Sequence, residues 1–254
     1  WAKDFVSWLV GLVYPQRVPR TPSSFAKVFA LECPARLMMT VPYRAHRMHF
    51  LPATDPRSAT SPATSAPLRV LSLEIPDVKI LMPPVFKDHR GFFSETYNKK
   101  ALTSAGIELD FVQDNHSLSR TRGVLRGLHY QSPPFAQAKL VRVVRGRIFD
   151  VAVDIRNGSP TFGKWVSAIL SAEEWNQILV PVGFAHGFVT LEPDTEVVYK
   201  VTNYYAPQHD HGVLWNDPDI GIAWPIDTTD VTLSEKDRNQ PRLRDIYSPF
   251  TYEP

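Results

Sequence analysis

Arg126, His129 and Lys139 place a guanidinium, an imidazole and an ammonium group in one short stretch, where two apolar strands are expected to meet. Histidine has a free pKa of about 6.5, which suits a general base at neutral pH. Arg126 and His129 are an odd number of residues apart, so both face inward on a strand only if a bulge or bend intervenes, and Gly127 can supply it. The cluster predicts proton-transfer chemistry on an anionic substrate, although a structural, hydrogen-bonded histidine is the commoner case.

The same stretch has the spacing of a cupin metal site but not its full set of ligands. The spacing is carried by Gly123 and His129 in the first motif and by Pro181, Gly183 and His186 in the second. Gln131 occupies the position of the first motif's second histidine, and Lys139 lies in the region of its glutamate. A catalytic metal usually has about three protein ligands. We therefore predict that no metal is bound and that acid–base groups and cations have replaced it.

Further candidates downstream are one histidine and three tyrosines. His186 is expected on a turn after an apolar strand, between glycines that let the backbone approach a ligand closely. It is interpreted either as a donor in a pocket wall or as a buried histidine satisfied by the main chain. Tyr199, Tyr204 and Tyr205 are expected on one strand, where a tyrosine can deliver a proton or stack on a base. Aromatic core packing is the alternative, and we expect it for Tyr204.

Polar side chains within strand-like sequence form a third group of candidates. They occur in residues 90–95 and 113–117, and they are interpreted either as ligand contacts or as edge strands with one wet face. Asp237 falls in the first turn of a short helix that Ser234 is expected to cap, a position that by itself predicts no chemistry.

An all-β domain that begins near Leu71 must position these candidates. Residues 149–155 alternate between apolar and polar side chains, the pattern of a half-buried strand. Further strands are expected at 139–144, 165–170, 177–180 and 196–204, which are rich in Val, Ile, Leu and aromatic residues. Only 98–105 and 172–175 are expected to be helical. Many short strands separated by turns predict a cupin-type double-stranded β-helix, which is a jelly roll.

The beginning of the chain differs in composition from the rest. Residues 1–70 have nine Lys/Arg and three Asp/Glu, a balance of +6, whereas residues 71–254 have nineteen and twenty-three, a balance of −4. Residues 1–70 are also rich in Pro and Ser, and we predict that they are a disordered or non-native N-terminal extension. A targeting segment is the alternative.

Composition excludes several classes of protein. The mildly acidic residues 71–254 argue against a nucleic-acid-binding protein. The single cysteine, Cys33, rules out an intramolecular disulfide. No run approaches the roughly 20 apolar residues of a membrane-spanning helix, so no membrane partner is predicted.

Residues 73–246 resemble the dTDP-4-dehydrorhamnose 3,5-epimerases, the cupin-fold enzymes of dTDP-L-rhamnose synthesis. The matching motifs include RGFF at 90–93, FVQDNHS at 111–117, VLRGLH at 124–129, SPTFG at 159–163, GFAHGF at 183–188 and WNDP at 215–218. With 149–156 and 199–207 they occur in order over some two-thirds of the chain. The resemblance implies that residues 71–254 form a cupin epimerase domain. It also implies a cytoplasmic homodimer that acts on a dTDP-4-keto-6-deoxy sugar without a cofactor.

The resemblance assigns a role to each candidate residue. His129 matches the catalytic base, and Asp237 matches the carboxylate paired with it. Tyr199 matches the general acid, and Lys139 matches the cation near the carbonyl oxygen of the sugar. Tyr205 matches the residue that stacks on the thymine ring. The substrate-binding positions are matched by Arg90, Glu95, Gln113, Asp114, Asn115, Arg126, His186, Asp210 and Lys236.

Other functions stay open at this point. The same fold could belong to a 3-only or 5-only epimerase, or to a ketoisomerase of a related nucleotide sugar. A metal cupin dioxygenase needs a third ligand, which Gln131 and Lys139 do not provide. A non-catalytic sugar-nucleotide binder is expected to lose His129 or Tyr199, and both are present.

Overall fold

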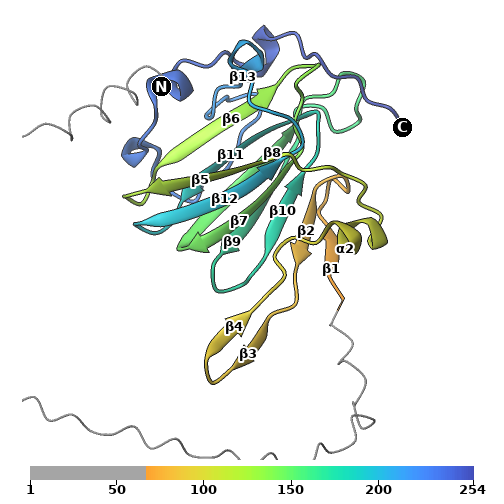
Figure 1. Ribbon diagram of the computed structural model, residues 1–254. Helices are drawn as coiled ribbons and strands as arrows, with labels where there is room; N and C mark the ends of the chain where they lie inside the picture. Colours follow the sequence, from red (N-terminus) through yellow and green to blue (C-terminus); the bar gives the residue numbers. More distant parts are fainter. Residues whose placement is uncertain (1–66) are drawn as a thin grey trace, which may run out of the picture. The chain divides into compact units, whose positions relative to one another are not determined.

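The structure, a computed structural model, describes residues 67–254. Two antiparallel sheets make up most of this part of the chain (Figure 1). The larger sheet has the strand order β1 (Arg69–Ser72), β2 (Lys79–Met82), β10 (Gln177–Val180), β7 (Lys139–Arg145), β12 (Thr195–Val201), β5 (Gln113–Ser119). The smaller has the order β13 (Asp210–Gly212), β6 (Leu125–Gln131), β11 (Phe184–Thr190), β8 (Arg147–Asp154), β9 (Trp165–Ser171). The predicted cupin-type jelly roll is confirmed.

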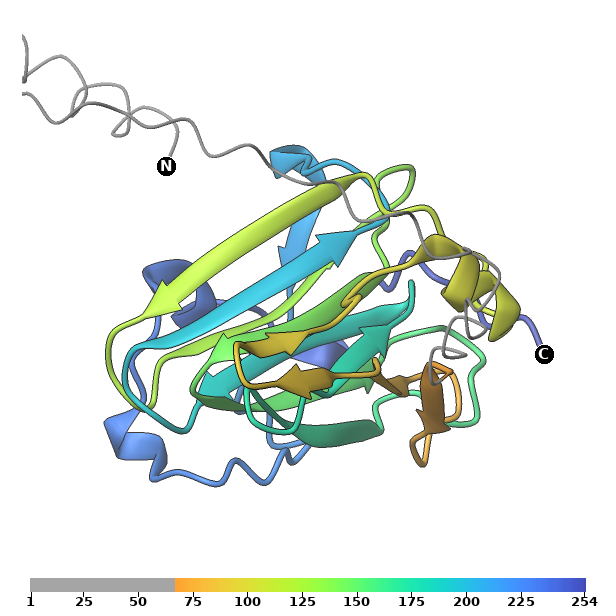
Figure 2. The ribbon, with the colours of Figure 1, turned by 60° about the horizontal axis from the view of Figure 1, so that its bottom comes forward.

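Three apolar clusters hold the sheets in place. One lies between the sheets and takes residues from both, such as Val141 and Val197 from the larger and Phe188 from the smaller. A second covers the outer face of the smaller sheet, where Trp224 and other residues of the C-terminal segment pack. A third lies under the helix α2 (Lys99–Ser104). Strands β5 and β12 run side by side at one edge (Figure 2), and there the residues of β5 on the face toward the smaller sheet are polar rather than apolar.

The predicted helices had different outcomes. Residues 98–105 contain α2, which Asn98 caps by accepting a hydrogen bond from the backbone of Ala101. The helix α3 (Glu235–Arg238) begins after Ser234, which caps it as predicted. Residues 172–175 form a turn, so that helix prediction was wrong. Trp175 there has a φ of 58°, which an α-helix excludes.

Strand β8 is buried on both faces, so the prediction of a half-buried strand was wrong. Asp150 and Asp154 are both 0% exposed. Each carboxylate tolerates burial because it is paired, Asp150 with His186 and Asp154 with Arg156. Alternating polarity in this strand marks two buried faces of different chemistry.

The tyrosines also depart from the prediction. Tyr199 lies on β12, but Tyr204 and Tyr205 follow the end of that strand. Tyr204 is 63% exposed, so its assignment to the core was wrong.

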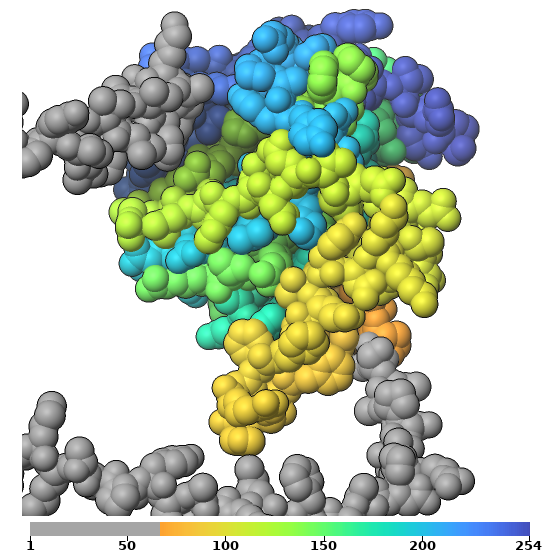
Figure 3. Space-filling view, in the orientation of Figure 1, coloured from red at the N-terminus to blue at the C-terminus, as the bar shows by residue number. Residues whose placement is uncertain are grey.

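A separate hairpin, β3 (Phe86–Asp88) and β4 (Gly91–Phe93), projects from the surface (Figure 3). Phe86, Phe92 and Phe93 on it are 45%, 66% and 64% exposed. Phe86 and Phe93 lie opposite each other in the hairpin, and exposed apolar side chains on a projecting element indicate an interaction surface.

Strand β1 begins at Arg69, slightly before the predicted start of the domain. The predictions for residues 1–66, and the thiol of Cys33, lie outside the described residues. Within 67–254, none of the helices has the length and hydropathy needed to cross a bilayer.

Candidate active site

His129 and Asp237 form a pair at the centre of the candidate site. His129 Nε2 lies 2.5 Å from Asp237 Oδ1, and Asp237 is 3% exposed. Burial opposes ionisation of this carboxyl group. The hydrogen bond and charge of His129, with bonds from Ser234 and the backbone of Gly127, outweigh that effect and lower the pKa of Asp237. Because an ionised carboxylate only accepts hydrogen bonds, Nε2 of His129 carries the hydrogen, and Nδ1 is left as the basic atom.

A bulge at Gly127 directs both Arg126 and His129 toward the larger sheet, as predicted. The pairing of β6 with β11 shifts register between these two residues, so that two residues of β6 lie opposite Gly187 alone. Gly127 has a φ of +125°, and a Cβ on it would lie 2.5 Å from the Cα of Gly187. Glycine is therefore required at this position by both conformation and space.

The facing wall of the site comes from the larger sheet. Tyr199 on β12 lies opposite Asn115 on β5, and both line a cleft of about 290 Å³ together with His129. Gln113 lines the same cleft and donates to Asn115 over 2.8 Å. Burial raises the pKa of Tyr199, and Asp210 adds to this while Arg126 opposes it. The phenol is therefore protonated at neutral pH, and it faces the cleft from a different sheet than His129 does.

Lys139 lies at the start of β7 beside the histidine. Its Nζ donates to the main-chain oxygen of His129 over 3.4 Å. Removal from water lowers the pKa of Lys139 to about 8, although Asp210 and Asp150 attract the charged form. Among residues 67–254, no carboxylate oxygen lies within 4.0 Å of this ammonium group. A half-buried cation with no direct counter-ion is suited to stabilise negative charge that develops on a substrate.

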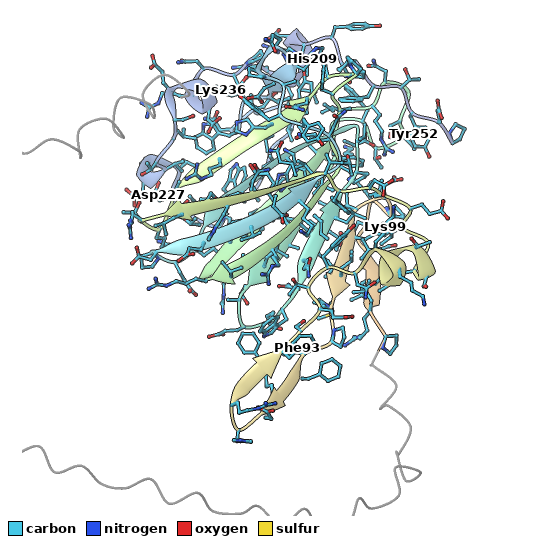
Figure 4. The ribbon with its side chains drawn as sticks, viewed as in Figure 1. Phe93, Lys99, His209, Asp227, Lys236 and Tyr252 are labelled. Carbon is cyan, nitrogen blue, oxygen red and sulfur yellow. The ribbon has the colours of Figure 1, made fainter. Side chains whose placement is uncertain are left out.

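The mouth of the cleft combines an aromatic ring with charged groups. Tyr205 is 57% exposed, and its hydroxyl donates to Asp210 Oδ2 over 3.1 Å. Asp210 also forms an ion pair with Lys236, which Figure 4 labels near β6. An exposed ring beside a cation can bind a planar base and an anionic group.

His186 lies within β11 and not on a turn, so that part of its prediction was wrong. It is opposite His129 in the pairing of β11 with β6. Its Nε2 is 2.9 Å from both carboxylate oxygens of Asp150, and both side chains are buried. A carboxylate, rather than the main chain, therefore satisfies this histidine.

Six predicted substrate-binding residues do not line the cleft. Arg126, His186 and Lys236 lie next to residues that do, whereas the other three lie farther away. Arg90 is on the hairpin and pairs with Asp88. Asp114 is exposed on the outer face of β5 and forms an ion pair with Lys200 over 2.8 Å. Glu95 lines a separate pocket of about 490 Å³ between the hairpin and α2. In Figure 4, Phe93 on the hairpin and Lys236 lie at opposite ends of the described part.

Some residues of the site were missed by sequence reasoning. Gln131 and Gln137 line the cleft, and Asp150 holds His186. The only signal for Gln131 in the sequence is its place in the cupin motif, where it replaces the second histidine. Asp150 gave no signal, because its alternation with apolar residues indicated a solvent-facing position. Within residues 67–254, no group of three or more His, Cys, Asp or Glu side chains is placed to hold a metal ion.

Comparisons with known proteins agree with this geometry. The family profile described as dTDP-4-dehydrorhamnose 3,5-epimerase matches residues 72–245. The protein of that name from Shigella flexneri is 54% identical over 179 residues, which are 70% of this chain and 97% of the relative. A crystal structure of dTDP-6-deoxy-D-glucose-3,5-epimerase from Legionella pneumophila, in complex with dTDP-4-keto-L-rhamnose, is similar with a TM-score of 0.70 and 44% identity. It covers 74% of this chain and 100% of that one.

A second solved structure represents a narrower activity. It is a 3'-monoepimerase from Streptomyces bikiniensis in complex with dTDP-quinovose, with 38% identity and a TM-score of 0.64. The match covers 68% of this chain and 87% of that chain.

Proposed function

The chain belongs to the dTDP-4-dehydrorhamnose 3,5-epimerase family, and we propose that it inverts C3 and C5 of dTDP-4-dehydro-6-deoxy-D-glucose to give dTDP-4-dehydro-L-rhamnose. This is an isomerase reaction of dTDP-L-rhamnose biosynthesis. It needs no redox or group-transfer cofactor, and the proposed setting is the cytoplasm.

One observation carries the proposal: a base and an acid face the same cleft from different sheets. C3–H and C5–H are both α to the C4 carbonyl, so each can be removed if the enolate oxygen is stabilised. His129 Nδ1 takes the proton from one face of the sugar ring, and Asp237 stabilises the imidazolium that forms. Tyr199, protonated at neutral pH, returns a proton from the other face and so inverts the carbon.

Lys139 is the proposed enolate stabiliser. It is the cation next to His129, and its partial burial reduces the screening of its charge by water. One lost contact to a developing oxyanion typically costs about 2.7–4 kcal/mol of barrier. His186, which Asp150 holds, lies opposite His129 on the neighbouring strand, and we assign it a contact to the sugar.

The nucleotide is proposed to bind at the mouth of the cleft. The exposed ring of Tyr205 stacks on the thymine, and Arg126 and Lys236 are available for the diphosphate. Asp210 orients both Tyr205 and Lys236 through the hydrogen bond and the ion pair already described.

Arg90 and Glu95 fit this site only if they come from a second copy of the chain. Their own chain directs the hairpin away from the cleft, and three phenylalanines on it are exposed. We therefore propose a homodimer in which each hairpin docks on the partner and completes the partner's site.

NMR of the product formed from dTDP-4-dehydro-6-deoxy-D-glucose in deuterated water tests the proposed function. A double epimerase gives deuterium at both C3 and C5 and the L-rhamno configuration. Deuterium and inversion at C3 alone would instead identify a monoepimerase, the activity of the Streptomyces bikiniensis relative. A chain that bound dTDP but exchanged neither position would be a non-catalytic binder.

A further inference from the structure

Gln131 makes three side-chain hydrogen bonds that converge on the segment carrying Tyr205. Its Nε2 donates to the carbonyl of Tyr204 over 3.1 Å and to that of Phe135 over 2.7 Å. Its Oε1 accepts from the backbone N–H of Ala206 over 2.8 Å. The main chain is thus fixed on both sides of Tyr205 by one side chain, which is 5% exposed.

The Tyr205 ring has little else to hold it. It is more than half exposed, and it follows the end of β12. Its own N–H donates to Gln113 Oε1 over 3.1 Å, and its hydroxyl meets Asp210. The direction of the ring therefore depends on the backbone of residues 204–206 together with the hydroxyl contact to Asp210.

Only an amide can make these three contacts. Two carbonyl oxygens need two donors, and one N–H needs an acceptor, which matches the two N–H groups and one oxygen of glutamine. A neutral histidine offers one donor and one acceptor on a rigid ring, and a glutamate offers no donor. The residue that replaces the second histidine of the cupin metal motif therefore has a function of its own.

We propose that Gln131 is a positioning residue for nucleotide recognition, which acts by holding Tyr205 in the orientation that stacks on the base. This inference rests on the proposed function, because it takes the ligand to be a thymidine nucleotide. It predicts that changes at Gln131 affect the affinity for dTDP far more than the rate of proton transfer, and that they do so only through Tyr205.

A double-mutant cycle read by calorimetry with dTDP tests the proposal. Gln131→Met keeps the length of the side chain and removes all three hydrogen bonds. Because the change weakens the stacking of Tyr205 on the base, Kd for dTDP is expected to rise roughly tenfold. In the Tyr205→Ala background the same change is expected to shift Kd less than about twofold, because the interaction it supports is already gone. The turnover number kcat should change less than about threefold.

Two further variants keep the test decisive. Gln131→Glu keeps the acceptor for Ala206 but loses both donors, and it replaces the methionine variant if that chain does not fold. Asn157→Ala removes a 2.8 Å bond from a side-chain amide to the carbonyl of Ser248, outside the residues that line the cleft. It should lower the melting temperature without changing Kd for dTDP.

The outcomes separate this inference from the proposed function. The inference would be overturned if the change at Gln131 raised Kd for dTDP equally in the wild-type and Tyr205→Ala backgrounds. A fall in kcat with Kd unchanged would overturn it too. The latter result would mean that Gln131 supports its strand neighbour His129 instead. If the wild-type chain did not bind dTDP, the proposed function itself would fail.

Discussion

At the scale of single residues, the site depends on which atom of His129 is basic. Asp237 occupies Nε2, so in the proposed mechanism Nδ1 accepts the proton from the substrate. His129→Asn keeps much of the size but has no basic nitrogen. It should reduce deuterium exchange at both C3 and C5 by about 10²–10⁴-fold while Kd for dTDP changes little.

Tyr199→Phe is the matched variant, because it removes the acid and leaves the base intact. Exchange without inversion should then exceed epimerisation, as measured by NMR in deuterated water. Near wild-type exchange in the His129 variant would show that another residue is the base.

The charge of Lys139 should limit activity at alkaline pH. Its pKa is lowered to about 8, so the ammonium form is present below this pH and is lost above it. Because the proposed mechanism stabilises the enolate through the charged form, kcat/KM is expected to fall about tenfold per pH unit well above pH 8. Lys139→Arg keeps its charge at every accessible pH and should shift the fall to higher pH. An unchanged alkaline limb in this variant would assign the limb to a different group.

At the scale of elements, the pattern of apolar and turn residues predicted the positions of the strands well, but it predicted the contacts of their side chains poorly. Residues 177–180 were predicted with the observed bounds of β10, because apolar β-formers there end at turn residues. In 172–175, by contrast, Ala and two Glu favour a helix, but so short a segment cannot nucleate one against the turn geometry at Trp175. Sequence also predicted the bulge that aims His129, but neither the partner of His186 nor the contacts of Gln131. Those contacts depend on which distant strand or loop packs against His186 and Gln131. The spacing of residues along the sequence does not give that information.

Gly127, in the bulge of β6, is a position where substitution should be costly. Gly127→Ala would force a Cβ to within 2.5 Å of Gly187 Cα and 2.7 Å of the carbonyl oxygen of His186, both backbone atoms. With the added cost of a positive φ, the free energy of unfolding should fall by roughly 3 kcal/mol or more. Gly158→Ala is the matched control, because its φ is +79° but nothing lies within 4 Å of its Cβ. Thermal melts should therefore show a clearly larger fall in melting temperature for Gly127→Ala than for Gly158→Ala. Equal falls would show that the backbone at the bulge can relax.

At the scale of the whole molecule, the catalytic domain should not need residues 1–66. Their composition is basic and rich in Pro and Ser, whereas the described residues 67–254 already form three apolar clusters among themselves. A shortened chain that begins at Pro67 keeps β1 intact and should retain the melting temperature and kcat/KM of the full chain. An insoluble or inactive product would mean that the earlier residues contribute to folding of the domain.

The homodimer proposal predicts that two impaired variants can restore activity in a mixed dimer, which a site built from one chain could not do. Arg90→Ala should impair the site of the partner, whereas His129→Asn should impair the site of its own chain. In a mixed dimer of these two variants, one site then contains both defects and the other contains neither. Two weakly active variants, unfolded and refolded together in equal amounts, should therefore recover activity toward about a quarter of the wild-type value, since half of random dimers are mixed.

The control for this experiment is mixing without refolding, which leaves each variant paired with itself if subunits exchange slowly. A second control refolds His129→Asn with Tyr199→Phe. Because His129 and Tyr199 line the same cleft of one chain, the mixed dimer of that pair still has one defect in each site. Recovery only with the Arg90 variant would locate Arg90 in the partner's cleft. If neither mixture recovered activity, Arg90 would act within its own chain or not at all, and the role of the projecting hairpin would have to be sought elsewhere.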